Sequence, residues 1–219
     1  MKIAISGPAA SGKGTIARKL ASEIAIGYVD LGLIFRLGAF ALDTRKTTNL
    51  GELLALIEDK TVDYLWHGGK ASITWQGEDV THLLLLQSIA HKTSVLSADA
   101  NQQERLIEIA NFVLATFEDV VCDGRNAGAT ILPGADYKFF VTASLEERAC
   151  RRHLDILRLG ENSSHEEMMC QVQERDRRDI ERSSNPFVIP DGAIVLETDT
   201  RSVEESVRFI LQVIGRSKP

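Results

Sequence analysis

The stretch Gly7-Pro8-Ala9-Ala10-Ser11-Gly12-Lys13-Gly14-Thr15 decides the fold of this chain. A short apolar run at 3–5 precedes it, and a run with helical character at 16–21 follows it directly. Strand, glycine-rich turn and helix in this order are the setting of a phosphate-binding loop, whose backbone N–H groups surround a phosphate at the start of a helix. The sequence therefore predicts that these nine residues bind the phosphates of ATP.

Two side chains of this loop carry specific chemistry. Lys13 supplies a mobile positive charge for the β- and γ-phosphates, and the Thr15 hydroxyl is a natural ligand of Mg²⁺. A glycine turn with a surface lysine is the alternative, but four matching features in one short stretch argue against it. The hydroxyl residue follows the lysine by two places instead of one, and this Gly-Lys-Gly-Thr ending is similar to that of nucleoside monophosphate kinases.

Composition limits the possible functions. The chain has 219 residues, a length that fits one α/β unit with a small insert. Its formal net charge of -6 argues against a general nucleic-acid binder. Cys122, Cys150 and Cys170 show no pairing or zinc-binding pattern, so we expect reduced thiols. No signal pattern and no apolar run long enough for a membrane span is visible. We expect a cytoplasmic monomer whose partners are small molecules, with neither nucleic acid nor membrane among them.

Alternating strands and helices predict a parallel sheet sandwiched by helices. The expected strands are 2–6, 26–30, 119–124, 137–142 and 193–198. Two β-rich runs across Gly68-Gly69 predict a hairpin at about 61–76, which breaks this alternation. We therefore divide the chain into a core, 1–35 and 115–219, and an inserted lobe, 36–114. Within the lobe we expect a helix over 83–96. We place the run Leu83–Leu86 in the interior of the lobe or at its contact with the core, with a surface for a partner as the alternative.

Charged residues at the ends of predicted elements suggest a binding site. The strand ending in Asp123-Gly124-Arg125 directs a carboxylate and a guanidinium to the carboxyl edge of the sheet, where open α/β sheets bind ligands. Asp123 is therefore a candidate Mg²⁺ ligand beside Thr15. Arg36 lies within an apolar helix and needs an anionic partner, either a structural carboxylate or a substrate phosphate.

Between residues 148 and 182 every basic residue except histidine is an arginine. Helical spacing places Arg175, Arg178, Asp179 and Arg182 on one face. A solvated helix with weak i,i+4 ion pairs is one interpretation. The other is a lid, at about 150–182 with a mobile tip at 160–164, that supplies arginines to the transferred phosphoryl group.

Taken together, these motifs resemble bacterial cytidylate kinases almost from end to end. The matching pieces are Gly7–Thr15, Asp30-x-Gly32-x-Ile34-Phe35-Arg36, Gly77-Glu78-Asp79-Val80, Asp123-Gly124-Arg125, Ser144-x-Glu146-Glu147-Arg148-Ala149-x-Arg151-Arg152 and Glu174-Arg175-Asp176-x-Arg178-Asp179-x-x-Arg182. The loop alone is generic, whereas the combination is specific. The resemblance implies phosphoryl transfer from Mg-ATP to CMP or dCMP, in a P-loop fold with a nucleoside-monophosphate-binding lobe.

The resemblance also implies roles for individual residues. The implied catalytic residues are Lys13, Arg125, Arg175 and Arg182. The implied acceptor-binding residues are Asp30, Arg36, Ser94, Asn126, Arg178 and Asp179. Either Arg148 or Arg152 is implied to lie against the donor adenine. Mg²⁺ is the implied cofactor.

Three positions depart from the family pattern. The family usually has Ser or Thr at Leu31, Arg at Gln103 and Asp at Asn126, and these positions contact the acceptor base in the enzymes that the chain resembles. An aspartate can only accept a hydrogen bond, whereas an asparagine can also donate. Either the three changes compensate one another and the acceptor is still CMP, or the acceptor is UMP, AMP or another small molecule. If the altered base pocket limits the use of CMP, Asn126→Asp should improve it.

Overall fold

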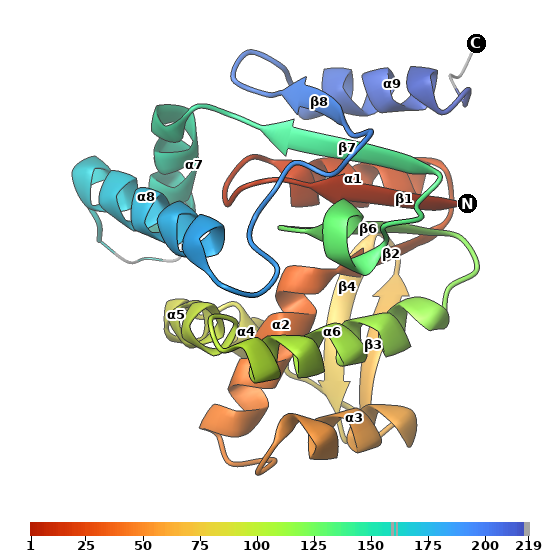
Figure 1. Ribbon diagram of the computed structural model, residues 1–219, viewed down its shortest axis with the longest axis vertical. Coiled ribbons are helices and arrows are strands. Elements are labelled where there is room, and N and C mark those ends of the chain that lie inside the picture. Colours follow the sequence, from red (N-terminus) through yellow and green to blue (C-terminus); the bar gives the residue numbers. More distant parts are fainter. Residues whose placement is uncertain (159, 161, 217–219) are drawn as a thin grey trace.

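The computed structural model describes residues 1–158, 160 and 162–216. Its centre is a parallel five-stranded sheet with the order β2-β6-β1-β7-β8 (Figure 1). The strands are β1 (Lys2–Ser6), β2 (Gly27–Asp30), β6 (Val120–Gly124), β7 (Tyr137–Thr142) and β8 (Ile194–Glu197). All five expected strands are present within two residues of their predicted ends, and the predicted α/β class is confirmed.

Alternating side chains of the sheet build two hydrophobic layers, because successive residues of a strand point to opposite faces. Ile3 and Ile5 of the central strand pack with helices α1 (Lys13–Glu23) and α9 (Val203–Val213). Ala4, between them in the sequence, belongs to the cluster on the other face. The central strand is thus buried on both faces, and its carboxyl end delivers the phosphate-binding loop to one edge of the sheet.

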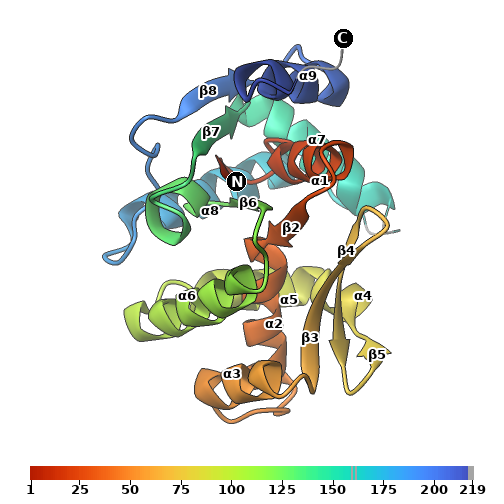
Figure 2. The ribbon, with the colours of Figure 1, turned by 90° about the vertical axis from the view of Figure 1, so that its right-hand side faces the viewer.

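A second layer covers that other face and extends away from it (Figure 2). Its helices are α2 (Leu31–Asp43), α3 (Leu50–Glu58), α4 (Thr81–Leu84), α5 (Gln87–Leu96) and α6 (Ala100–Ala115). A small antiparallel sheet accompanies them, with strands β3 (Val62–His67), β4 (Lys70–Trp75) and β5 (Glu78–Asp79). Gly68 and Gly69 close the predicted hairpin, both with positive φ, which glycine adopts without steric cost.

One helix in this layer differs from its expectation. The region 83–96 forms two helices, α4 and α5, that are interrupted at residues 85 and 86. Leu84 is buried, but Leu85 and Leu86 are 54% and 49% exposed, so the predicted interior position of the whole leucine run is wrong. The run exceeds what one helix face can bury, because residues adjacent in sequence point in different directions.

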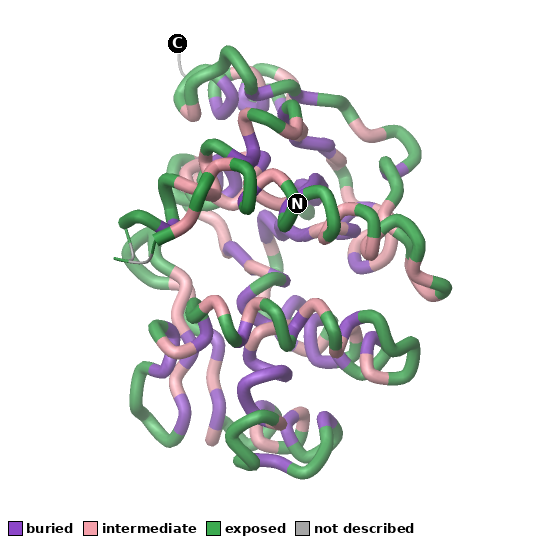
Figure 3. The backbone as a smooth tube through the Cα atoms, turned by 90° about the vertical axis from the view of Figure 1, so that its left-hand side faces the viewer, coloured by how far each residue is buried: buried purple, intermediate pink, exposed green. Residues whose placement is uncertain are grey.

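Two arginine-rich helices, α7 (Leu145–Arg158) and α8 (His165–Glu181), form a hairpin beside the sheet. Ala149, Ile156 and Met168 make a small apolar contact between them. Figure 3 shows that buried residues follow the interior of both layers, while the outer turns of the helices are exposed. Residue 161, in the expected mobile tip at 160–164, lies outside the described residues. In the described ranges, no helix has the length and apolar character of a membrane span.

A short π-helix, η1 (Ala127–Ile131), follows β6 directly and completes the set of elements. Its first residues face the central strand on one side, and an added Cβ at Gly128 would lie 3.4 Å from the Cβ of Ala4. Asn126 precedes it, at the point where the sheet ends. The elements that bear on the candidate site therefore meet at the carboxyl edge of the sheet.

The close packing of α2 against α6 yields a stability prediction. An added Cβ at Gly38 would lie only 2.5 Å from Leu106 Cδ2, and Leu106 is completely buried. Leu106→Ala should lower the free energy of unfolding by about 2–5 kcal/mol, because it leaves a cavity in a close-packed seam. Leu86→Ala, at a half-exposed leucine, is the control. Denaturant titrations of both variants measure the effect, and equal losses in the two would contradict it.

Candidate active site

The phosphate-binding loop is shaped by two glycines. An added Cβ at Gly7 would lie 2.1 Å from the carbonyl oxygen of Val141, so only glycine permits this approach to the neighbouring strand. Gly12 adopts φ +85° and is the N-cap residue of α1. Because glycine has no side chain, the first N–H groups of α1 donate no hydrogen bond to a capping side chain. Thr198 supports the loop from behind, because its hydroxyl donates to the Ser11 carbonyl at 3.0 Å. The free N–H groups at the start of α1 can bind a phosphate.

Lys13 and Asp123 are the principal titratable pair beside this loop. Burial lowers the pKa of Lys13 to about 8, although the nearby Asp123 carboxylate opposes that shift. Burial, together with the neighbouring Asp30 carboxylate, raises the pKa of Asp123 to about 7. The Tyr28 hydroxyl donates to Asp123 Oδ1 at 2.6 Å and thereby fixes the carboxyl group. Burial therefore disfavours the charged forms of Lys13 and Asp123 in the free protein, and a bound phosphate or cation would stabilise them.

A network of arginines and aspartates joins α8 to the edge of the sheet. Arg125 lies 3.1 Å from Asp176 Oδ1 and 2.9 Å from Asp179 Oδ2. Arg148 contacts the other oxygen of Asp176 at 2.5 Å, and Arg182 approaches Asp179 at 3.8 Å. All five side chains are at most 17% exposed. The two aspartates thus pair with three guanidinium groups in a largely buried setting and leave a net charge of about +1 in the network.

Arg175 and Arg36 are arranged differently. Burial lowers the pKa of Arg175, and the guanidinium groups of Arg125, Arg36 and Arg152 lower it further. Arg36 is also held at a lowered pKa by burial, and it donates to the Leu84 carbonyl at 3.3 Å. Among the described residues, no carboxylate lies within ion-pair distance of either guanidinium. Such groups favour an anionic ligand, and this supports the phosphate alternative for Arg36.

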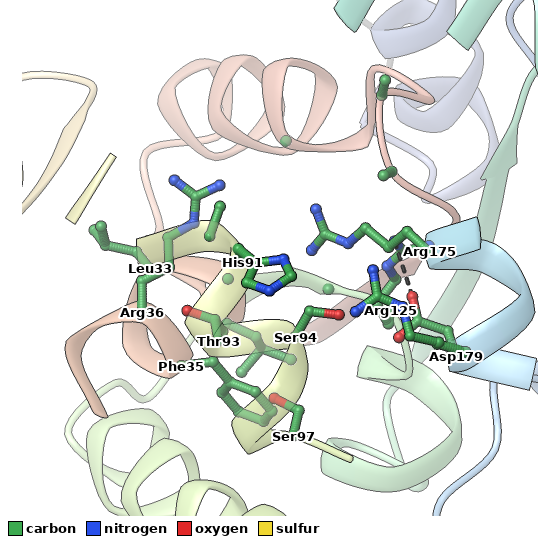
Figure 4. A pocket seen from close by; sticks show the side chains of 18 of the residues that line it. Leu33, Phe35, Arg36, His91, Thr93, Ser94, Ser97, Arg125, Arg175 and Asp179 are labelled. Atoms are coloured by element: carbon green, nitrogen blue, oxygen red, sulfur yellow. Dashed lines mark ion pairs between the residues drawn. The ribbon is translucent and has the colours of Figure 1, made fainter. Parts of the chain in front are cut away.

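Lys13, Asp123 and most of these arginines line a large cavity of about 1050 Å³ between the sheet edge, α2, α5 and α8 (Figure 4). Figure 4 shows Arg175 pointing into it from α8, with His91 and Ser94 of α5 and Arg36 of α2 around the same space. The predicted site residues that line it are Ala9, Ala10, Lys13, Gly14, Asp30, Arg36, Ser94, Asp123, Arg125, Asn126, Arg152, Arg175, Arg178, Asp179 and Arg182. Segments distant in sequence thus meet in one place.

Other predicted site residues do not line the cavity. They are Gly7, Pro8, Ser11, Gly12, Thr15 and Arg148. Thr15 is exposed, and the position next to Asp123 is occupied by Gly14, where an added Cβ would lie 3.6 Å from Asp123 Oδ2. Arg148 is 7% exposed and donates to the Ala143 carbonyl as well as to Asp176. Of the two arginines considered for the donor adenine, Arg152 is therefore the one with access to the cavity.

At two of the departures from the family pattern, the side chain has no polar atom or its donor group is already engaged. Leu31 is buried and packs on Gly124, where an added Cβ would lie 2.6 Å from Leu31 Cδ1. The Asn126 Nδ2 group donates to the carbonyls of Asn185 and Pro186, both at 2.9 Å. The amide nitrogen of Asn126 is therefore bound by the protein itself.

Several supporting residues were not singled out from the sequence as site residues. Tyr28 orients Asp123, and Asp176 joins Arg125 to Arg148. Arg151 donates to the Thr198 carbonyl at 2.7 Å and so supports the phosphate-binding loop indirectly. Arg151 and Asp176 lie within the quoted motifs, whereas nothing in the local sequence of Tyr28 indicates its long-range partner.

Comparison with known proteins identifies the family. A family model described as cytidylate kinase matches residues 3–216. A curated cytidylate kinase from Caldanaerobacter subterraneus subsp. tengcongensis is 35% identical over 219 residues, which cover 99% of this chain and 96% of the relative. One from Desulforamulus reducens is 34% identical, covering 99% and 97%, and one from Bacillus cereus is 32% identical, covering 98% and 96%.

A solved structure shares the fold at lower sequence similarity. It is a shikimate kinase from Bacteroides thetaiotaomicron, with a TM-score of 0.52, 13% identity and coverage of 98% of each chain. This likeness supports the α/β fold alone. The family model that matches residues 3–216 and the relatives at 30% identity and above show the family as well. The chain therefore belongs to the cytidylate kinase family, whose members are nucleoside monophosphate kinases.

Proposed function

We propose that this protein transfers the γ-phosphoryl group of Mg-ATP to the 5′-phosphate of CMP or dCMP. The observation that carries this proposal is the cavity of about 1050 Å³, which has a phosphate-binding loop at one wall and convergent arginines at the others. Its volume lies at the upper end of the range of small-molecule pockets and suits two nucleotides at once. The products would be ADP and CDP or dCDP.

The donor would bind at the loop Gly7–Thr15. Backbone N–H groups at the start of α1 would hold its phosphates, while Lys13 Nζ, now 3.2 Å from the Pro8 carbonyl, would turn to the β- and γ-phosphates. Arg152, which lines the cavity, would lie against the adenine, where a planar guanidinium can stack.

The acceptor would bind between α2, α5 and α8. Arg36, Arg125 and Arg182 would hold phosphate oxygens, and Arg175 would bind the acceptor phosphate or stabilise the charge that develops during transfer. Asp30, Arg178 and Asp179 would complete the phosphate and ribose contacts, and the Ser94 hydroxyl would contact the base. In-line transfer then requires positioning and charge stabilisation, without a covalent enzyme intermediate or a strong base.

Mg²⁺ would be the cofactor, and the residues present suit it. The Asp123 carboxyl group, with its raised pKa and the nearby Asp30 carboxylate, is an oxygen ligand that a divalent cation would stabilise. The ion would neutralise charge on the phosphates as they react. The Thr15 hydroxyl, which is exposed in the free protein, would be the second candidate ligand.

The proposed division of labour follows the fold. Residues 36–114 would act as the acceptor-binding lobe, and the segment at about 150–182 would close over the donor as a lid. Residues 1–35 and 115–219 would supply the core. We further propose that the protein acts as a cytoplasmic monomer, because its cavity lies within one chain and its substrates are small metabolites.

A second acceptor is supported by a specific observation. Leu31 offers no polar atom at a position where the family usually has a hydroxyl, and Asn126 is engaged by backbone carbonyls. A kinase of the same fold acting on UMP, AMP or a small pathway-specific acceptor is therefore the alternative. The phosphate-binding residues are common to both possibilities.

An acceptor panel tests this function directly. We expect ADP release from Mg-ATP with CMP and dCMP to exceed that with AMP, GMP or no acceptor. Lys13→Ala should lower kcat by about 10²-fold or more, because the transition state loses a charge in a dry site, while the fold persists. Coupled ADP detection and circular dichroism are the measurements. Turnover like the wild type in Lys13→Ala, or purine acceptors above CMP, would contradict the proposal.

Proton uptake offers a test that needs no turnover. Since the pKa of Lys13 is about 8 in the free protein, the amine is partly neutral at that pH. Phosphate anions raise the pKa of a neighbouring amine, so ADP binding without Mg²⁺ should take up roughly half a proton at pH 8. Calorimetry in buffers with different ionisation enthalpies measures this uptake. Lys13→Met should bind ADP without it, and buffer-independent heats in the wild type would contradict the assignment.

A further inference from the structure

A short segment after α8, residues 182–187, closes one end of the cavity, and we call it the strap. Its last residue is fixed at three points: Phe187 donates its backbone N–H to the Asp179 carbonyl at 2.8 Å, and its ring stacks on Phe140 and lies beneath the Arg125 guanidinium. Arg182, its first residue, lines the cavity. The position of the strap therefore determines where the Arg182 guanidinium lies.

Two buried amides hold the middle of the strap. Asn126 uses both donor hydrogens of its Nδ2 group, one for the Asn185 carbonyl and one for the Pro186 carbonyl, each at 2.9 Å. Its Oδ1 atom is completely buried and has no hydrogen-bond partner among the described residues. The amide can neither turn nor offer a donor to a ligand.

Gln103 repeats this arrangement from α6. In the amide orientation that pairs donors with acceptors, it donates to the Ser184 carbonyl at 2.9 Å and accepts from Arg182 NH1 at 3.0 Å. Gln103 is only 3% exposed. The two positions where the family usually has an Arg and an Asp are thus neutral here, and both bind the strap between residues 182 and 186.

We propose that Gln103 and Asn126 form a two-amide clamp that positions the strap and Arg182, and that neither residue reads the acceptor base. This inference rests on the proposed nucleotide kinase function and concerns how that site selects its acceptor. An ionic Arg–Asp pair could not do the same work, since an aspartate cannot donate to two carbonyls. Where the family pattern has a charged Arg–Asp pair, the clamp has neutral amides that donate hydrogen bonds to backbone carbonyls.

The clamp has a consequence for the acceptor. Leu31 has no polar side-chain atom, and the Gln103 amide and Asn126 Nδ2 are engaged by the strap. Asn126 Oδ1 has no partner but is completely buried, so these positions offer the ligand no accessible polar atom of fixed polarity. The remaining polar groups around that part of the cavity include the hydroxyls of Ser94, on α5, and Ser97, directly after α5 (Figure 4). A hydroxyl can donate or accept, so it can pair with the 4-amino group of cytosine or the 4-oxo group of uracil. The site should therefore accept both pyrimidine monophosphates.

Asn126→Asp is the variant that tests the clamp, because it keeps the size of the side chain and removes both donors. A carboxylate 2.9 Å from two carbonyl oxygens would release the strap, so amide hydrogen exchange of Phe187 should accelerate by at least about tenfold. Asn111→Asp, the same change at an exposed position of α6, is the matched control and should leave exchange unchanged. Exchange is measured without substrate, so it reports on the clamp even if the proposed function is wrong.

Kinetics separates a positioning role from base recognition. The wild type should use CMP and UMP with kcat/KM values within about tenfold of each other, since no contact of fixed polarity distinguishes them. Asn126→Asp should lower kcat for both by about tenfold or more, with their kcat/KM ratio changed less than about threefold. A ratio that moves tenfold or more toward CMP would identify Asn126 as a base contact and overturn the proposal. This is the opposite of the improvement that the family pattern alone leads one to expect.

Gln103→Leu examines the clamp from its other side and provides a second variant if Asn126→Asp does not fold. It removes both hydrogen bonds of Gln103 at similar volume, so Phe187 exchange should again accelerate and kcat should fall for both pyrimidines. Gln102→Glu, at the preceding position of α6, is the control. Unchanged exchange and unchanged kcat in Gln103→Leu would exclude the clamp.

Discussion

The balance of charge around the cavity is the constraint on which the site depends. Guanidinium groups from four parts of the chain converge there, and a buried positive charge is costly unless an anion accompanies it. Asp176 and Asp179 supply that anion for Arg125, Arg148 and Arg182, at distances from 2.5 to 3.8 Å. The protein thus stabilises part of its positive charge internally and leaves the remainder for a ligand.

The same network limits how α8 can move. Its C-terminal half is joined to the sheet edge through Asp176 and Asp179, and the strap continues this attachment through Phe187. Separating these groups would leave buried charges without partners, at a cost of several kcal/mol. The closure over a donor that we propose for α7 and α8 would therefore turn about this fixed end. Such a pivot would keep the acceptor side of the cavity constant while the donor side closes.

How far the sequence predicts the site depends on the range of each interaction. The phosphate-binding loop and the glycine hairpin are local patterns, and helical spacing suffices to align Arg175, Arg178, Asp179 and Arg182 along the cavity. The bond from Tyr28 to Asp123 spans 95 residues, and that from Asn126 to Asn185 spans 59. No periodicity encodes such pairs, which arise only when the sheet and the strap have formed. The position of Arg148 was equally hidden, because a buried and an exposed arginine look alike in sequence.

A residue at a family's functional position can therefore do different work when its neighbours change. Position 126 follows the carboxyl end of β6 and lines the cavity. An asparagine there can donate two hydrogen bonds, and the turn at Asn185 and Pro186 presents two carbonyls to receive them. Once those bonds form, the side chain holds the strap in place and its donors are not available to a ligand. The pattern of neighbouring acceptors, more than the residue type, then decides whether a polar side chain meets the ligand or supports the residue that does.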